Sequence, residues 1–523
     1  AIQAAGLIDA LSAPGPFTVF APVNSAFASL PAGELQRLLD PANLGELQEL
    51  LQFHVVPGAF TAGDLSEGAS LVTLTGEALT VSLQGGPSVN GISILETDIE
   101  ASNGFIHLIG GVLLPSRESI AATAAASSGL TTLVAALSAA GLVDALAGDG
   151  PFTVFAPVNA AFAALGDGVI GNLLDPANLD LLTSILTYHV VPGAAVYAGE
   201  LSDGQTVTTL QGENLAIGVS AEGVTVNGAN VTSINIRASN GVIHLVDGVL
   251  VPELDIVETA IVTPQTQTLV AAVAAGGLVS TLQSEGPFTV FAPINEAFEA
   301  LGSTAIENLL DPANQAILQK VLTYHVIAGD IRAADLTNGA SVQTVQGTNV
   351  TIDLSGDLPM VNGASIIATD IVVGNGVIHL IDGVLTENLD LVDQAVINGF
   401  STLVGAVQGA GLEATLRSGN AGEGFTVFAP TNEAFAALAA IPSGDALVSV
   451  LTSHVVGATV ASGDLLDGQV VSTVEGSTFT VNIDGNGVSL TDATGQTVMV
   501  VLTDVPASNG VIHVIDGVIL PGA

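Results

Sequence analysis

The sequence predicts an α+β fold that occurs four times in tandem, and two observations carry this prediction. The first is the string Thr-Val-Phe-Ala-Pro, which starts at Thr18, Thr153, Thr289 and Thr426, so that its period is 135 to 137 residues. A repeat of this length is the size of a whole domain and too long for a solenoid unit. The second is the order within each period, where helical patterns come first and short β-rich runs follow, which is typical of α+β domains.

The period divides the 523 residues into four predicted domains, called repeats 1 to 4 from here on: 1–115, 116–252, 253–387 and 388–523. Each is long enough to bury a core of its own. Repeat 4 diverges from the others, because it has three more residues between Gly411 and Thr426 and lacks the Asp-Pro-Ala-Asn string found in the other three. Terminal repeats are often atypical in this way.

Repeat 1 is expected to lack its first helix, because Ala1 aligns with Ala136 of repeat 2. The missing segment corresponds to residues 116–135, whose apolar side chains should be buried in repeat 2. We therefore expect an apolar groove in repeat 1, filled by upstream residues of a longer chain or by another molecule. A chain that starts with Ala1 in the middle of a repeat indicates a processed or partial protein.

The helical half of repeat 2 is predicted element by element. Residues 116–126 form a helix of small residues, and residues 131–146 form a second helix with an apolar stripe. The strand of Thr-Val-Phe-Ala-Pro follows, and Asn159 is expected to cap the helix after it, as are Asn24, Asn295 and Asn432 in the other repeats. Asp175 and Pro176 are a good N-cap and first helical residue for a helix that runs to His189.

The second half of repeat 2 is predicted to be a mostly antiparallel sheet. Short β-rich runs at 207–210, 215–219, 224–226 and 231–236 are separated by Gly and Asn turns. Asn240-Gly241 is a hairpin signal. The last run, residues 242–250, is apolar on both faces and should be a central strand that is covered on both sides.

The charge balance excludes several classes of partner. The formal net charge is −44, with only six Lys and Arg residues against 50 Asp and Glu. Nucleic acids and anionic membranes need a basic face, so neither is expected to bind. Mean hydropathy is positive, yet Ser, Thr and Gly interrupt every apolar stretch, so no membrane insertion is expected within these residues. The acidity and the single lysine, Lys320, indicate a bacterial source in saline surroundings.

Two motifs resemble the fasciclin (FAS1) domain family. One is Gly-Pro-Phe-Thr-Val-Phe-Ala-Pro-x-Asn-x-Ala-Phe at 286–298, and the other is Asn-Gly-Val-Ile-His-x-x-Asp-Gly-Val-Leu at 375–385. The resemblance recurs four times and covers essentially the whole chain. It implies a compact wedge or sandwich of β-strands packed with several helices. It also implies a secreted or surface-anchored protein that acts in adhesion and extracellular matrix.

A Tyr-His pair lies between the two motifs in repeats 2 and 3. The pairs are Tyr188-His189 and Tyr324-His325, whereas repeat 1 has Phe53-His54 and repeat 4 has Ser453-His454. This region has been linked to integrin binding in animal members of the family. The resemblance therefore implies that Tyr188, His189, Tyr324 and His325 are partner-binding residues.

All eight histidines fall into two sets of position. The helical set follows apolar residues at −7, −4 and −3, so these rings continue a buried helical face: His54, His189, His325 and His454. We expect hydrogen-bonded core histidines, and a ligand or partner contact is the alternative. The strand set lies in doubly buried runs, each nine residues after an Asp or Asn that could accept a hydrogen bond: His107, His244, His379 and His513.

No catalytic or metal-binding constellation is expected. A zinc site built from one His of each set would need a third protein ligand, and none recurs at a fixed spacing. The chain has no cysteine, no nucleophile-elbow signature, no phosphate loop and no dinucleotide fingerprint. Asp484-Gly485-Asn486-Gly487 is interpreted as a hairpin turn, since later calcium-loop carboxylates are missing. Asn230 and Asn349 each begin a glycosylation sequon. We therefore predict a protein that is not an enzyme and that uses no cofactor.

The sequence thus predicts a secreted or surface-displayed adhesion or structural protein, located outside the cell or on its surface. Its expected partners are other proteins or cell-surface and matrix polysaccharide, with self-association head to tail into an extended fibre or filament. The alternative is an extracellular small-ligand or carbohydrate-binding protein with a pocket near the Tyr-His pairs.

Overall fold

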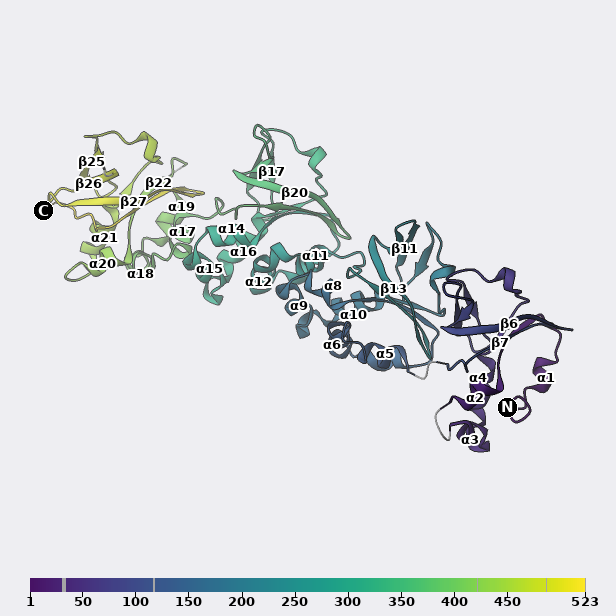
Figure 1. The fold of residues 1–523 in the computed structure, drawn as a ribbon. Coiled ribbons are helices and arrows are strands. Elements are labelled where there is room, and N and C mark those ends of the chain that lie inside the picture. Colours follow the sequence, from purple (N-terminus) through teal and green to yellow (C-terminus); the bar gives the residue numbers. More distant parts are fainter. Residues whose placement is uncertain (31–33, 116–117, 421, 486, 523) are drawn as a thin grey trace. The chain divides into compact units, whose positions relative to one another are not determined.

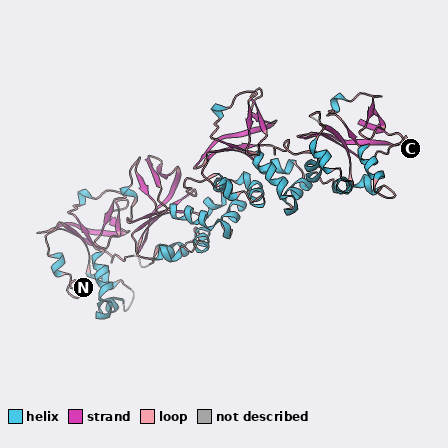
Figure 2. Ribbon diagram, turned by 180° about the vertical axis from the view of Figure 1, so that it is seen from behind, coloured by secondary structure: helices cyan, strands magenta, loops and turns pink. Residues whose placement is uncertain are grey.

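The structure is a computed structural model that describes residues 1–30, 34–115, 118–420, 422–485 and 487–522. The chain forms two compact units, Ala1–Pro252 and Glu253–Ala523, and each unit holds two repeats. Within each repeat the helices gather on one side of the strands (Figures 1 and 2). The predicted α+β class, repeated four times, is confirmed.

Repeat 2 shows the complete order of elements. Its helices are α5 (Ile120–Ala125), α6 (Thr131–Ala139), α7 (Val143–Ala147), α8 (Asn159–Ala163), α9 (Asp167–Leu173), η3 (Pro176–Asn178), α10 (Leu179–Tyr188) and η4 (Ala198–Glu200). Its strands are β8 (Phe152–Pro157), β9 (Val190–Pro192), β10 (Thr206–Thr208), β11 (Asn214–Ser220), β12 (Gly223–Val226), β13 (Ala229–Ala238) and β14 (Gly241–Val246).

Repeat 1 follows the same order from the short helix before its first strand onward. Its elements are α1 (Ile8–Leu11), β1 (Phe17–Pro22), α2 (Asn24–Ala28), α3 (Glu34–Leu39), η1 (Pro41–Asn43), α4 (Leu44–Gln52), β2 (Val55–Pro57), η2 (Ala62–Asp64), β3 (Ser70–Val72), β4 (Ala78–Ser82), β5 (Ser88–Val89), β6 (Ile92–Ala101) and β7 (Gly104–Ile109).

The second unit contains repeats 3 and 4. Repeat 3 has α11 (Ile256–Val262), η5 (Pro264–Thr266), α12 (Gln267–Ala275), α13 (Val279–Leu282), β15 (Phe288–Pro293), α14 (Asn295–Ala300), α15 (Ser303–Leu310), η6 (Pro312–Asn314), α16 (Gln315–Tyr324), β16 (Val326–Ala328), η7 (Ala333–Asp335), β17 (Ser341–Gln343), β18 (Asn349–Asp353), β19 (Met360–Val361), β20 (Ala364–Val373) and β21 (Gly376–Ile381). Repeat 4 has α17 (Leu391–Ile397), α18 (Ser401–Gly409), α19 (Glu413–Ser418), β22 (Phe425–Pro430), α20 (Asn432–Ala436), α21 (Asp445–Thr452), β23 (Val455–Val456), η8 (Ser462–Asp464), β24 (Val470–Ser472), β25 (Thr478–Asp484), β26 (Gly487–Thr491), β27 (Thr497–Ala507) and β28 (Gly510–Ile515).

Each repeat contains one seven-stranded sheet, and the strand order is the same in all four. In repeat 2 the order is β10-β11-β12-β13-β14-β8-β9. Neighbouring strands are antiparallel except β14 and β8, which run parallel with His244 opposite Phe155. The last strand is therefore central, as predicted, and the two motifs that carry the family resemblance lie side by side.

The sheet curls until its two edge strands approach each other. In repeat 2 the backbone N–H of Leu210, just after β10, donates to the carbonyl of Val190 in β9 at 2.6 Å. The inner face of the curled sheet holds an apolar core that includes Phe155, Leu215 and Ile217. The outer face of the central strands packs against the helices instead. This is the predicted wedge of strands packed with helices.

The Asn-Gly hairpin fixes both the sheet and a helix end. Gly241 has φ +152°, and a Cβ at this position would lie 2.0 Å from the carbonyl oxygen of Phe152 in β8. Only glycine therefore lets β14 approach β8 this closely. The side chain of Asn240 donates to the carbonyls of Leu146 and Gly148, where α7 ends. The predicted hairpin is confirmed, and its Asn has a second structural role.

Two helix predictions need correction. The helix expected over 131–146 is two helices, α6 and α7, because Gly141 between them adopts φ +68°. Asn159 does not cap its own helix. Its Oδ1 accepts from Thr132 N at 3.0 Å, and its Nδ2 donates to Ser128 O at 2.9 Å, so it caps α6 from a distance. Asn295 and Asn432 make equivalent bonds, whereas Asn24 is exposed.

The N-cap at Asp175 is confirmed, since its side chain accepts from Ala177 N at 2.8 Å. The helix that follows begins as the 3-10 turn η3 before it becomes α10. The first predicted helix of repeat 2 is α5, capped by Ser119. Its predicted start at residues 116–117 lies outside the described residues.

Repeats 1 and 2 meet through a polar contact between strands. The N–H of Ala78 in β4 donates to the hydroxyl of Tyr197 at 2.9 Å, and Arg237 of β13 donates to Thr80 Oγ1 at 2.8 Å. Tyr197 is completely buried there. Tyr197 and Arg237 thus tie the second repeat to the sheet of the first.

Repeats 3 and 4 meet through helices instead. Nearly all side chains of α17 are buried, because the helix lies between α15 of repeat 3 and α18 and α19 of repeat 4. Lys320 of α16 contacts Asp393 of α17, and Arg417 of α19 contacts the same carboxylate. Asn388 donates to the carbonyl of Lys320 at 2.9 Å. The two joints therefore have different chemistry.

Candidate functional site

The two Tyr-His pairs lie at the C-terminal ends of α10 and α16. Tyr188 and Tyr324 are the last helical residues, and His189 and His325 are the C-caps. All four side chains are buried, with exposures of 2 to 4%. A partner would therefore contact the surface around these residues and not the aromatic rings of the Tyr and His side chains.

The helical histidines use both ring nitrogens within their own repeat. Nδ1 of His189 lies 2.7 Å from the carbonyl oxygen of Ile185, and Nε2 accepts from the N–H of Leu250 at 2.9 Å. Because a backbone N–H can only donate, the proton of the neutral ring must be on Nδ1. The other three rings have the same two bonds: His54, His325 and His454.

Burial holds these rings neutral. It lowers the pKa of His189 from 6.5 to about 4, and the hydrogen bond to Ile185 opposes this only partly. The pKa of the other three helical histidines is also lowered to about 4 by burial. With both nitrogens bonded and no charge, each ring fixes the end of a helix to the segment after the last strand. These contacts match the core interpretation.

The tyrosine hydroxyls are also bonded internally. Tyr188 donates to the carbonyl of Asn214 at 3.0 Å and accepts from Asn227 Nδ2 at 2.7 Å. Tyr324 makes the same pair of bonds with Asn349 and Asn362. Each tyrosine thus ties a helix end to a β-hairpin turn. A partner-binding role for Tyr188, His189, Tyr324 and His325 stays a prediction.

Repeat 4 replaces the tyrosine by Ser453 and compensates for the lost volume. The position that is Leu215 in repeat 2 is Phe479, which is 1% exposed and packs edge-on against Phe428. Ser453 is fully buried and donates to the carbonyl of Val450. A small residue on the helix therefore goes together with a large one on the strand, as close packing requires.

The strand histidines have the opposite tautomer. Nδ1 of His244 accepts from the backbone N–H of Asn235 at 3.3 Å, and Nε2 lies 2.9 Å from the carbonyl oxygen of Val196. The side chain of the Asn or Asp nine residues earlier, which could have accepted a hydrogen bond from the ring, does not do so. That side chain instead accepts from the N–H of Ala198, where η4 begins. The other repeats show the same arrangement around His107, His379 and His513.

The remaining candidate loops and metal ligands add no site. β25 and β26 pair directly from Asp484 to Gly487, which confirms the predicted hairpin, although Asn486 at its tip lies outside the described residues. Across the described ranges, no group of three or more His, Cys, Asp or Glu side chains is placed to hold a metal ion. In the same part of the chain, no helix has both the length and the apolarity needed to cross a bilayer.

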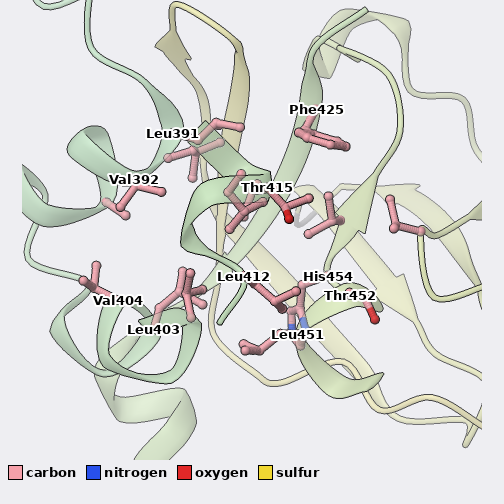
Figure 3. A pocket seen from close by; sticks show the side chains of 17 residues that line it. Leu391, Val392, Leu403, Val404, Leu412, Thr415, Phe425, Leu451, Thr452 and His454 are labelled. Atoms are coloured by element: carbon pink, nitrogen blue, oxygen red, sulfur yellow. The ribbon is translucent and has the colours of Figure 1, made fainter. Parts of the chain in front are cut away.

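An apolar cavity of about 60 Å³ lies in repeat 4 between the helices and β22 (Figure 3). Leu451 of α21 and His454, which follows that helix, lie at one side of it, and Leu391 and Leu403 come from α17 and α18. Repeat 3 has a cavity of about 30 Å³ at the corresponding place, against His325. The alternative prediction placed a pocket near the Tyr-His pairs. The smaller cavity contacts His325 but is not lined by Tyr324, and the larger one lies in repeat 4, which has no Tyr-His pair.

The comparison with known proteins decides the family. A family model described as "Fasciclin domain" matches residues 1–115, 128–252, 264–387 and 398–521. The chain belongs to the fasciclin domain family. Transforming growth factor-beta-induced protein ig-h3 of Sus scrofa is 30% identical over 533 residues, covering 98% of this chain and 74% of that protein.

Two further relatives span less of the chain. Periostin of Homo sapiens is 31% identical and covers 72% of this chain and 44% of its own length. Protein sll1483 of Synechocystis is 50% identical over 139 residues, which is 27% of this chain and 76% of that protein. The solved FAS1 domain pair from the insect cell adhesion molecule Fasciclin I is 17% identical, with a TM-score of 0.27, and covers 47% of this chain and 92% of that chain.

Each of the four fasciclin domains exposes an aliphatic side chain at the same position. The residue follows a buried Thr, and its backbone N–H donates to the strand that follows the helical histidine. The four exposed residues are Leu74, Leu210, Val345 and Val474. Their exposures are 42, 46, 46 and 51%. Sequence reasoning missed this position, although a nearly constant spacing of 20 or 21 residues after each helical histidine could have revealed it.

Proposed function

We propose that the chain is a secreted or surface-displayed adhesion or structural protein that acts outside the cell. In this proposal its four fasciclin domains, 1–115, 116–252, 253–387 and 388–523, contact other proteins or cell-surface and matrix polysaccharide. Contacts of the same kind between copies, head to tail, would build an extended fibre. Family membership supports the adhesive role, and the main structural observation behind it is the exposed aliphatic residue that recurs in each repeat.

The recurring residue has the properties of a contact point. Exposed apolar side chains scattered singly over a surface need no explanation, but one that recurs at the same hydrogen-bonded position in four domains does. In repeat 2, Leu210 is held beside Val190, the residue directly after Tyr188-His189. The Tyr-His pairs therefore act in this proposal by holding the strand that presents the contact, which gives their region a place in partner binding.

Four equal contacts on one chain favour multivalent binding. Each contact alone is weak, but once one domain is bound, the next binds at a high effective concentration. A protein with this arrangement attaches firmly to a surface that repeats its own binding partner. Fibre-like matrix and polysaccharide are surfaces of that kind.

The test is cell attachment to surfaces coated with the parent chain or with a variant in which Leu74, Leu210, Val345 and Val474 are all changed to Ser. We expect the variant to lose most attachment, and variants with one change to lose little. Ile234→Ser and Leu358→Ser form the matched control, since these side chains are 50% and 49% exposed and the other repeats have no aliphatic residue at either position. The proposal would be contradicted if cells attached to the parent chain no better than to an albumin coat. It would also be contradicted if they attached equally well to the fourfold variant.

The second candidate function is binding of a small extracellular ligand. The cavity beside His454 is the observation that favours it. Its apolar lining fits a carbohydrate poorly, because sugar hydroxyls need hydrogen-bond partners. A ligand-binding role would therefore rest on repeat 4 and on an apolar molecule.

A further inference from the structure

Apart from Thr415 at its mouth, the described residues that line the cavity of repeat 4 leave no polar side chain for a ligand. Thr452 points its hydroxyl at the carbonyl of Val448, at 2.7 Å, and both ring nitrogens of His454 are bonded to backbone. The rest of the inner lining is aliphatic or aromatic: Leu391, Val392, Ala395, Leu403, Val407 and Phe425. A buried water needs two to four polar partners. The interior therefore suits a hydrocarbon and not water.

The cavity reaches the protein surface at one end. Thr415 of α19 is exposed, and Val474 is 51% exposed, while both line the cavity. Figure 3 shows Thr415 near Phe425, on the side away from Val404 and Leu403. A ligand can thus enter beside α19 without unfolding of the helices.

The comparison with repeat 3 shows which feature enlarges the cavity. Ile256, Ala260 and Leu269 line the smaller cavity and correspond to Leu391, Ala395 and Leu403. The lining of repeat 4 additionally includes Leu412 and Thr415 at α19. This helix has six residues where α13 has four, and it precedes the three-residue extension that distinguishes repeat 4. The extension that makes repeat 4 divergent thus coincides with the mouth of the cavity.

Size and charge specify the ligand further. Pockets for whole drug-sized molecules are roughly 300–1,000 Å³, so a cavity of about 60 Å³ holds only the end of a chain. Glu475, exposed directly after the mouth residue Val474, adds a negative charge to this part of a chain of net charge −44, although its carboxylate accepts from Ser449 and Ser477. A neutral head group is favoured there over an anionic one. We propose that repeat 4 binds the end of an alkyl chain whose head group is uncharged.

This proposal goes beyond adhesion and gives the second candidate function a ligand class. The probe is 1-octanol, titrated into the full chain and followed by ligand-observed NMR, with octanoate as its anionic counterpart. We expect saturable binding of octanol and binding of octanoate that is at least tenfold weaker. This titration contains no cells or matrix. A failure to bind octanol would therefore not affect the adhesive proposal, which is tested separately by cell attachment.

Two variants test the location. Ala395→Leu fills the cavity and should weaken octanol binding at least tenfold, whereas Ala260→Leu at the corresponding position of repeat 3 should leave it unchanged. Thr415→Glu puts a carboxylate at the exposed mouth and should also weaken binding, and it decides the matter if Ala395→Leu fails to fold by circular dichroism. Absence of saturable octanol binding to the parent overturns the proposal. Equal binding by the parent and Thr415→Glu does so too.

Discussion

Lys320 of repeat 3 places its Nζ 2.5 Å from Oδ2 of Asp393 in repeat 4. The carboxylate is 1% exposed, and Arg417 donates to its other oxygen at 2.7 Å. A buried carboxylate is costly unless it is paired. Two of the six basic residues in the chain therefore pair with one acidic side chain, which fixes the joint between the two repeats, and Arg417 also pairs with Asp390 and Glu413.

Removing Lys320 should loosen that joint. We expect Lys320→Ala to destabilise α17 by about 1–2 kcal/mol, because Arg417 still pairs with Asp393 and Lys320 itself is 42% exposed. Hydrogen exchange of the α17 amides measures the change. Arg332→Ala is the control, since its partner Asp330 is 38% exposed, against 1% for Asp393, so that solvent screens the pair. Equal effects of the two substitutions would contradict the structural role of Lys320.

The helical histidines predict a pH dependence of stability. The folded ring of His189 has a pKa of about 4 against 6.5 for the free side chain. Between these values the unfolded chain binds a proton that the folded chain does not. This contribution is complete above pH 6.5 and is lost as the pH falls to about 4, with a slope of up to about 1.4 kcal/mol per pH unit.

The substitution His189→Gln isolates the contribution of this histidine to the pH dependence of stability. At neutral pH the variant should be less stable by about 1–3 kcal/mol, because a buried backbone group loses its partner. Below pH 6.5 its stability should fall less steeply than that of the parent. The measurement is hydrogen exchange of the α10 amides at several pH values, corrected for intrinsic rates. A variant that keeps parental stability but loses binding would favour the partner-contact alternative.

Tyr324→Phe separates the two roles considered for the Tyr-His pairs. It removes the bonds to Asn349 and Asn362 but keeps the ring, and repeat 1 already has Phe53 at this position. We expect a loss of about 1 kcal/mol in repeat 3 and unchanged cell attachment at a temperature where the domain is folded. Attachment that drops without any change in thermal unfolding would show that the hydroxyl itself contacts a partner.

Repeat 1 should respond to a helix added in trans. Val19, Phe27 and Ile106 are half-buried, whereas their counterparts in repeat 2 are 1 to 4% exposed: Val154, Phe162 and Ile243. We expect fragment 1–115 to bind an apolar dye and to melt without cooperativity, and fragment 116–252 to melt cooperatively. A peptide of residues 118–140 should sharpen the first transition. A sharp melt of 1–115 alone would refute the groove.

Salt should raise the melting temperature of the whole chain. With a net charge of −44, like charges repel one another in the folded state, and added sodium chloride screens that repulsion. The buried contacts of Asp393 are screened less than surface charges and should persist. Calorimetry at low and high sodium chloride is the measurement. A flat or falling melting temperature would mean that the surface charges lie too far apart to matter.

Local patterns in the sequence predicted much of the fold. The Asp175 cap, the hairpin at Asn240-Gly241 and the buried last strand depend on neighbours within a few residues, so a single sequence suffices to predict them. Gly141 was the local exception, because a helix interrupted by one glycine has the same apolar stripe as a continuous helix. The recurrence of most elements in several repeats strengthened each of these predictions.

Contacts between distant residues could not be predicted in the same way. Asn159 is a residue type that often caps helices, and it stands at the start of a helix. Its side chain nevertheless caps another helix, at Thr132, 27 residues earlier in the chain. The sequence offered the side chain of Asn235 as a candidate acceptor for His244, whereas the structure shows its backbone N–H donating to that ring. The parallel pairing of β8 with β14 and the size of the cavity also depend on how separate segments pack. A single sequence, taken without an alignment of its relatives, shows the residue types for such contacts but not their partners.

The curled sheet has a consequence for a chain of four similar domains. Unpaired strand edges invite pairing with another copy of the same strand, and tandem domains hold such copies at high local concentration. Here the hydrogen bond from Leu210 to Val190, and its equivalents in the other repeats, joins the two edges of each sheet and narrows the opening between them. The closure therefore acts as a safeguard against strand exchange and amyloid-like misassembly during synthesis. It lets similar neighbours fold side by side as separate units.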